Sequence, residues 1–347
     1  MTSHYTVESS TFDFHSSDTA VLDGKSVGEL VHTAKLRQEK AERIQLNQLR
    51  FESNGTLDNG MGFSEEGFNQ LLKTIAIPRR VVDNLMDTGG RRIAVDAVRH
   101  LMREASPDMA LVAMEGVVEG AIDVSSPPVG HGDALTLLNE AIDRATLPID
   151  KLKVARAKFT GLHLNVSLVS DAPDTLLLPG DSIRAGVELS HSEGGGVEGR
   201  VAGFLFRLIC TNGAIAKLGE ESGAISRGSG ADALMRRRIE SAVDASINLL
   251  GKIRPAAQIE IDKAAGHYHF LRMSERFGKV AANRALGHAA DEATRWRRPF
   301  TSAYDLWNGV TDTAKLAPSP TRRWAMESYS ADVLDWGADR FARLSQN

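Results

Sequence analysis

Few residues in this chain have both the type and the spacing that catalysis needs, and the histidines come first. His191 stands two residues before Glu193, and His267 stands two residues before His269. On a β-strand such pairs share a face and can hold a metal ion, whereas on an α-helix they point about 200° apart. Residues 267–269 have a helical pattern, and His191 precedes a triple-glycine turn, where a solvated position is expected. We therefore expect no metal and no cofactor.

Nucleophilic and phosphate-binding motifs are equally weak. Cys210, the single cysteine, follows two apolar residues, a setting typical of a small buried hydrophobe. A reactive thiol needs positive or histidine-rich surroundings, which the sequence does not identify. The glycine-bearing stretches 194–199 and 219–230 both lack the spacing of a Walker A loop. We expect no catalytic residue, with one alternative kept open, a hydrolase that uses His191, Glu193 or Cys210.

Arginine clusters are the strongest chemical signal. The chain has 41 basic and 45 acidic side chains, a formal charge of −4, so nucleic-acid binding would need a local basic patch. Residues 236–298 supply one, with 13 basic against 7 acidic side chains. Arginines bind phosphates bidentately and tryptophan rings stack on unpaired bases, although most charge runs are simply solvated helix faces. The predicted nucleic-acid-binding residues are Arg200, Arg207, Arg227, Arg236, Arg237, Arg238, Arg295, Trp296, Arg297 and Arg298.

Capped helices are expected early in the chain. Ser26 precedes apolar residues at helical spacing and has Glu29 three residues later, the pattern of a capping box, which predicts a helix start there. Ser64 opens a second helical stretch that reaches residue 86, and Pro78 divides it into two helices. A further helix is expected over residues 133–145.

The middle of the chain has the pattern of strands. The expected strands cover residues 110–118, 159–170, 183–190 and 201–210. Residues 183–190 alternate strictly between apolar and polar side chains, which is typical of a half-buried strand. Such strands favour an antiparallel sheet over the parallel sheet of a Rossmann fold. Asn212-Gly213 then predicts a tight turn.

The last third changes to a helical period. Apolar residues recur every three or four positions from residue 235 until Pro255, which is expected to end the helix. Further helices are expected over residues 256–297, 303–312 and 322–343. The predicted fold class is α+β, an antiparallel sheet core with a mainly helical C-terminal third. The predicted domains are a polar, partly ordered N-terminal arm (1–60), an α+β sheet domain (61–230) and a helical region that packs on the sheet (231–347).

Composition indicates a cytoplasmic address. A single cysteine allows no disulfide within the chain and fits a reducing compartment. There is no apolar run of about 18 residues, the length that a membrane span requires. The first residues have neither the basic start nor the apolar block of a signal peptide. We therefore expect no membrane contact.

Two segments carry a family resemblance. Residues 187–213 read as a strand, a small polar turn and a second strand that ends in Arg207-Leu-Ile-Cys-Thr-Asn212, and residues 302–311 read Ser-Ala-Tyr-Asp-Leu-Trp-Asn-Gly-Val-Thr. Together they resemble the phage/plasmid-like protein family, a domain of unknown function encoded in phages, plasmids and integrated elements. The resemblance covers about residues 180–330, and Gly309 stands where alanine is usual in that family.

The resemblance implies the biology of mobile elements and brings no catalytic residue with it. The run from Arg207 to Asn212 allows two interpretations. It is structural if Arg207 finds an internal partner and Asn212 sets the turn, or it contacts a ligand directly. The resemblance therefore leaves the chemistry of the chain open.

These observations support one main hypothesis and one alternative from a different class. The first is a non-enzymatic, DNA-associated accessory protein of a phage, plasmid or mobile element that binds or anneals single strands and forms a homo-oligomer. The alternative is an assembly module that forms a homo-oligomer or binds a host protein without nucleic acid. The aromatic-rich helix expected at residues 303–311 and the net negative charge favour the alternative.

Overall fold

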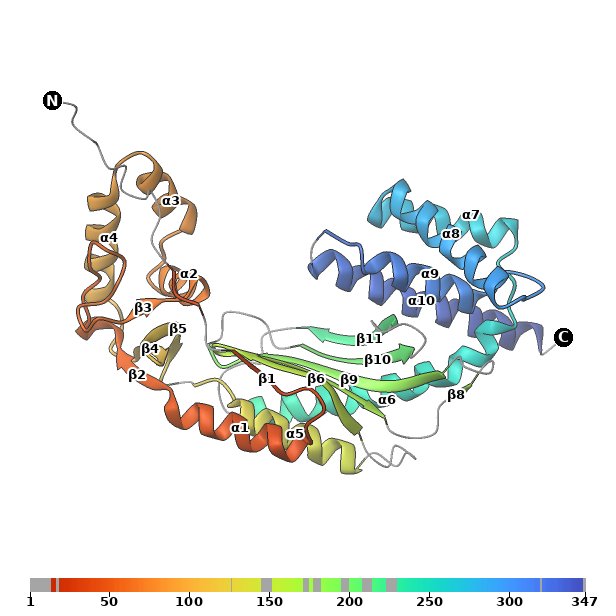
Figure 1. Cartoon of the computed structure of the whole chain (residues 1–347), viewed down its shortest axis with the longest axis horizontal. Helices are drawn as coiled ribbons and strands as arrows, with labels where there is room; N and C mark the ends of the chain where they lie inside the picture. Colours follow the sequence, from red (N-terminus) through yellow and green to blue (C-terminus); the bar gives the residue numbers. More distant parts are fainter. Residues whose placement is uncertain are drawn as a thin grey trace.

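The computed structural model describes residues 14–16, 19–125, 127–144, 152–170, 175–176, 182–194, 200–207, 214–222, 230–318 and 320–345. Two β-sheets occupy the first two-thirds of the chain, and helices follow from residue 231 (Figure 1). This arrangement confirms the α+β fold class, with an antiparallel sheet core and a mainly helical C-terminal third. No helix of the described part of the chain is long and apolar enough to cross a membrane.

The large sheet is antiparallel throughout, as the alternating sequence pattern predicts. Its strands are ordered β1-β6-β7-β9-β10-β11, and β8 pairs with β9. The strands are β1 (Thr19–Val21), β6 (Leu152–Thr160), β7 (His163–Ser170), β8 (Thr175–Leu176), β9 (Ser182–Ser192), β10 (Arg200–Arg207) and β11 (Ala214–Ser222). The strand expected over residues 159–170 is therefore the end of β6, a turn and β7. The turn predicted at Asn212-Gly213 lies outside the described residues.

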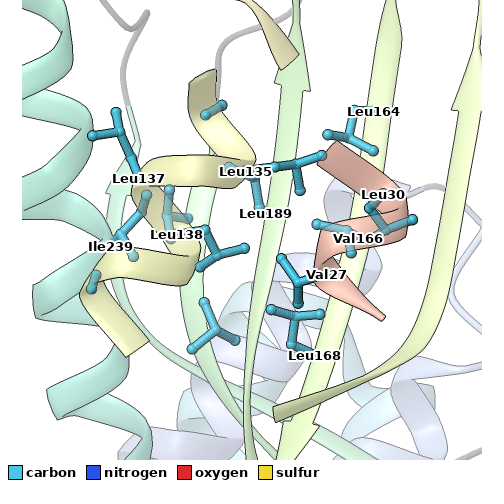
Figure 2. Close-up of a cluster of buried hydrophobic side chains, with 14 of the residues drawn as sticks. Val27, Leu30, Leu135, Leu137, Leu138, Leu164, Val166, Leu168, Leu189 and Ile239 are labelled. Carbon is cyan, nitrogen blue, oxygen red and sulfur yellow. The ribbon is translucent and has the colours of Figure 1, made fainter. Parts of the chain in front are cut away.

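Helices cover one face of this sheet. They are α1 (Val27–Lys40), α5 (His131–Arg144) and the first half of α6 (Ala231–Ala257). Leu164, Val166 and Leu168 of β7 point toward these helices, and Figure 2 shows them beside Val27 and Leu30 of α1 in the same buried cluster. Burying each such leucine stabilises the fold by about 1.5–3 kcal/mol, so this contact fixes the sheet against the helices.

A β-bulge in β6 decides which side chains reach the opposite face. The pairing of β6 with β7 shifts between Val154 and Arg156, so Ala155 is an extra residue. Val154 and Ala157 face the helices and are buried, while Lys153, Arg156 and Lys158 all lie on the other side. Under strict alternation Lys153 would face away from Arg156 and Lys158. The bulge therefore gathers three basic side chains on one face.

The smaller sheet is mixed and has the order β2-β4-β5-β3. Its strands are β2 (Glu42–Gln45), β3 (Gly62–Phe63), β4 (Met109–Met114) and β5 (Val117–Asp123), and its helices are η1 (Leu46–Gln48), α2 (Glu65–Thr74), α3 (Arg79–Asp87) and α4 (Arg91–Arg103). The single strand expected over residues 110–118 is wrong. Glu115 and Gly116 both have positive φ and turn the chain into a hairpin of β4 and β5.

Both predicted N-caps of the first hundred residues are confirmed. Ser26 and Glu29 form the capping box of α1, and the Ser64 side chain accepts from the Gly67 N–H at the start of α2. Pro78 is the N-cap of α3. In the region predicted as a polar arm, β1 pairs with β6 and β2 pairs with β4, so this segment contributes to both sheets.

The C-terminal helices form a layered bundle at one end of the molecule (Figure 1). They are α7 (Lys263–Phe277), α8 (Lys279–Arg295), α9 (Ala303–Ala314) and α10 (Pro320–Leu344). The prediction that Pro255 ends a helix is wrong, because α6 continues to Ala257 with Pro255 in its last turn, where few hydrogen bonds are lost. Helix α9 is buried along nearly its whole length, so it is an internal element and offers no outer surface.

Candidate nucleic-acid interface

The arginines of α6 are largely used inside the molecule. Arg236 forms a 2.8 Å ion pair with Glu140 of α5, and Arg238 is buried. Arg237 points to solvent. The run of three arginines therefore leaves one exposed side chain on this helix.

The second cluster, residues 295–298, supports the start of α9. Trp296 donates its indole N–H to Glu292 at 2.6 Å. Arg298 pairs with the fully buried carboxylate of Asp305, which also caps the helix by accepting from the Ser302 N–H at 2.8 Å. Burial raises the pKa of Asp305, and its hydrogen bonds from Ser302 and the charge of Arg298 oppose that rise. Arg295 and Arg297 are exposed.

These two clusters do not form one patch. Arg238 and the end of α6 at Ala257 are 19 residues apart, roughly 28 Å along a helix. The segment after residue 295 returns to that far end, where Ser302 pairs with Glu260. The two groups of arginines therefore lie at opposite ends of α6.

The remaining predicted residues belong to the large sheet or to its connections. Arg200 begins β10, and Arg207 ends it, although the side chain of Arg207 is outside the described part. Arg227 and Cys210 also lie outside the described residues. Of Arg200, Arg207 and Arg227, Arg200 is thus the one whose side chain the structure describes, and it lies at a surface.

That surface is the side of the large sheet opposite α1, α5 and α6, here called the open face. Its members are the exposed or half-exposed side chains Lys153, Arg156, Lys158, His163, Asn165, Ser167, Arg184, Glu188, Ser190 and Arg200. Residues opposite one another in neighbouring strands share a face. One row across four strands is Lys158–Asn165–Ser190–Arg200, and the next is Arg156–Ser167–Glu188–Ala202.

The open face is basic. It carries five arginines and lysines but one carboxylate, Glu188, among the side chains that the structure describes. Arg156 and Lys158 are exposed and form no ion pair with any described residue. Sequence analysis missed them because the bulge interrupts the alternation of β6, and because the three basic residues are spaced along a strand rather than clustered.

One end of the open face is closed to solvent. Phe204 is buried and its ring lies against Gly186, where an added Cβ would stand 2.6 Å from the ring. Val169 and Ala202 beside it are also buried. The described part of the open face therefore presents no exposed Phe, Tyr or Trp ring for base stacking, and apart from Val21 of β1, which lies opposite Lys158, its accessible part is charged and polar.

The histidine predicted to be solvated is in fact buried. His191 lies inside β9, and its Nε2 is 2.8 Å from the carbonyl oxygen of Val129. Its ring meets that of His131 edge to face, with 5.2 Å between centroids, and Nε2 of His131 is 3.0 Å from the Leu162 carbonyl. Burial lowers the pKa of both imidazoles, that of His131 well below its usual range. Solvation was expected because glycines follow His191, but its pairing with Leu164 turns it into the core.

Glu193 supports the start of α5. Its carboxylate accepts the backbone N–H of His131, the first residue of that helix, and burial raises its pKa. A small cavity of about 20 Å³ beside it is lined by Gln38, Arg43 and Leu162 among others, room for about one water molecule. Glu193 and His191 thus hold backbone groups in place, and Cys210, the third residue of the hydrolase hypothesis, lies outside the described residues.

The other histidine pair follows its prediction. His267 and His269 lie on helix α7, where His267 is exposed and His269 is buried. Nδ1 of His269 is 2.9 Å from the Tyr329 hydroxyl, and burial lowers the pKa of His269 to about 4. Among the described residues no group of three or more His, Cys, Asp or Glu side chains could hold a metal ion.

Comparison of the chain with protein-family models, with curated proteins and with solved structures finds no match. The function is therefore inferred from the geometry of the open face.

Proposed function

We propose that this protein binds single-stranded DNA on its open face, as a non-enzymatic accessory protein of a phage, plasmid or mobile element. The observation that carries the proposal is the exposed pair Arg156 and Lys158, two cations on one face with no ion-pair partner in the described chain. Neutralising phosphates releases counterions from the nucleic acid, which supplies most sequence-independent affinity. The resemblance to phage and plasmid proteins gives the biological context.

The open face has the chemistry of a single-strand site. Side chains two residues apart on a strand are separated by about 6.6 Å, close to the distance between neighbouring phosphates of an extended strand. Lys153, Arg156 and Lys158 therefore form a basic rim along β6, with the bulge aligning the first with the other two. Asn165, Ser167 and Ser190 beside this rim offer hydrogen-bonding groups to a strand whose bases are unpaired.

The test is a salt series on the double variant Arg156→Ala/Lys158→Ala. Binding of a fluorescein-labelled single strand is followed by anisotropy from low to physiological salt. The loss of two phosphate contacts should weaken binding and make the slope of log K against log salt shallower by about 1.4, or about 0.7 per contact.

A matched control removes the same charge from another surface. Lys73 and Arg80 are exposed on or beside the helices of the small sheet, so Lys73→Ala/Arg80→Ala changes the net charge equally. This control should keep the slope of the parent protein. Equal slopes in the parent protein and in Arg156→Ala/Lys158→Ala, or no binding at low salt, would remove the open face as the binding site.

One observation favours the assembly alternative. Tyr268 and Leu271 lie one turn apart on α7 and remain 47% and 52% exposed, an apolar pair on an outer helix. The helix at residues 303–311 gives no such support, because it is buried within the chain. Native mass spectrometry of the parent protein and of Tyr268→Ser/Leu271→Ser tests the alternative. An oligomer that the substitutions dissociate and that ignores DNA would support it.

A further inference from the structure

We infer that the imidazole ring of His163 is a stacking platform on the open face, and that it receives an unpaired base from a strand whose phosphate is bound by Lys158. The inference rests on the proposed function and deepens it. The basic rim explains affinity for phosphates, which single strands and duplexes share, but it gives no preference for unpaired bases. A stacking ring supplies that preference, because the bases of a duplex are already stacked on one another.

His163 is the aromatic side chain that the described part of the open face presents to solvent. It is partly exposed, whereas the ring of Phe204 on the same face is buried. His131 and His191 each place Nε2 within hydrogen-bonding distance of a backbone carbonyl oxygen, but His163 forms no hydrogen bond with any residue that the structure describes. Within the described chain, the ring of His163 therefore holds no backbone group in place.

The register of β6 and β7 places His163 next to the basic rim. Thr160 lies directly opposite His163, and Lys158 precedes Thr160 by two residues on the same face. Diagonal neighbours of this kind are about 7–8 Å apart, within reach of long and aromatic side chains. One nucleotide can span this separation from its phosphate to its base. A phosphate on Lys158 therefore allows the attached base to lie on His163.

The hairpin turn that carries His163 is held by other elements. The side chain of Leu162 is buried in a cluster with residues of the small sheet, and the Leu162 carbonyl oxygen lies 3.0 Å from Nε2 of His131. Arg37 of α1 donates to the carbonyl oxygen of Gly161 at 3.2 Å. Because its backbone is already fixed, His163 loses little conformational freedom when a base stacks on its ring, which favours binding.

The ring carries no charge at neutral and alkaline pH. Burial lowers the pKa of His163, and the charges of Glu66 and Glu119 oppose this effect without reversing it. The imidazole is therefore neutral above about pH 7. A neutral ring stacks on a base but neutralises no phosphate, so its removal should lower the affinity without changing the salt slope.

The experiment measures anisotropy at about pH 8 with two fluorescein-labelled strands of equal length, oligo-dT and an abasic strand with the same number of phosphates. His163→Ala should weaken binding of oligo-dT by about fivefold to a hundredfold, the usual effect of losing one stacking ring, and leave the salt slope unchanged. The same variant should bind the abasic strand as the parent protein does, because that strand has no base to stack. His163→Phe should restore the affinity for oligo-dT. His32→Ala, at an exposed histidine of α1 on the other side of the sheet, is the matched control and should change neither affinity.

A second variant tests the apolar surface on the other side of Lys158. Val21 of β1 lies opposite Lys158 and is 62% exposed. Its side chain has no π-face, so Val21→Ser should lower the affinity for oligo-dT less than His163→Ala does. The reverse order would place the base on the outer side of β6 and overturn the assignment to His163.

The remaining outcomes separate this inference from the function on which it rests. An equal loss of affinity of His163→Ala for oligo-dT and for the abasic strand would make His163 a structural residue and overturn its stacking role. Unchanged affinity of this variant for oligo-dT, with binding still dependent on Arg156 and Lys158, overturns the inference and leaves the proposed function intact. No binding of either strand to the parent protein at low salt overturns the proposed function itself.

Discussion

The arginines of the C-terminal helices and the basic residues of the open face use the same chemistry in opposite ways. Arg236 and Arg298 are packed in sequence among other arginines, and both neutralise carboxylates of the chain itself. Arg156 and Lys158 are spaced along a strand, and both remain exposed. Three of the six clustered arginines, Arg236, Arg238 and Arg298, are thus held within the molecule, and the exposed ones do not form one patch, whereas the basic residues spread along one strand share a surface.

Removing Arg298 should have the largest effect on folding free energy, and it tests most directly whether the clustered arginines are structural. Arg298→Ala would leave the buried carboxylate of Asp305 without its counter-charge at the start of α9. Breaking such a pair typically costs about 3–5 kcal/mol of folding free energy. Urea unfolding should show this loss, and Arg297→Ala, at an exposed neighbour, should show little. A loss near that of the neighbour would mean that Arg298 is available for binding after all.

Lowering the pH tests the contribution of the buried histidines to stability. The folded-state pKa values of His131 and His191 are lowered by burial, so below about pH 6.5 the unfolded chain takes up protons that the folded chain does not. Stability should hold above that pH and fall as the pH decreases toward the folded-state values. Urea midpoints between about pH 7 and pH 5 measure it. The double variant His131→Gln/His191→Gln should show a shallower fall, and an unchanged fall would assign it to other groups.

The smallest effects come from single charges. Arg236→Ala removes a partly exposed ion pair and should cost about 0.2–1 kcal/mol, without a change in the salt slope of DNA binding. Lys158→Ala should leave stability almost unchanged and make that slope shallower by about 0.7. Parallel denaturation and anisotropy measurements on both variants test the pair. If Arg236→Ala changed the salt slope and Lys158→Ala did not, the binding site would lie on α6 and not on the sheet.

Local sequence signals predicted local structure well. Ser26 and Ser64 mark helix starts because the side chain that caps each helix lies within three residues of the N–H that it accepts. The alternation at residues 183–190 predicted a half-buried strand because one face of β9 packs on helices. These features depend on neighbours in sequence, so the sequence alone was sufficient.

The candidate site depended on distant neighbours and was mostly missed. Glu140, the partner of Arg236, is 96 residues away, and nothing in the sequence links the two. Most of β6 was missed because its alternation breaks at Ala155. His191 was placed in solvent because its buried neighbours come from other elements. Arg200 was included in the predicted set, but the rim at Lys153, Arg156 and Lys158 required the register of the sheet.

The bulge at Ala155 also changes the exposed edge of the large sheet. After Val21 the chain runs along the outer edge of β6. It forms two backbone hydrogen bonds with that strand, from Leu22 N–H to Ala157 O and from Gly24 N–H to Val154 O. Such a weakly covered edge is a template for pairing with another molecule, unless twist and charge discourage it. An extra residue increases the local twist, and Lys153 and Arg156 place like charges where two copies would have to meet. We therefore expect this one inserted alanine to oppose the extension of this edge into an intermolecular sheet.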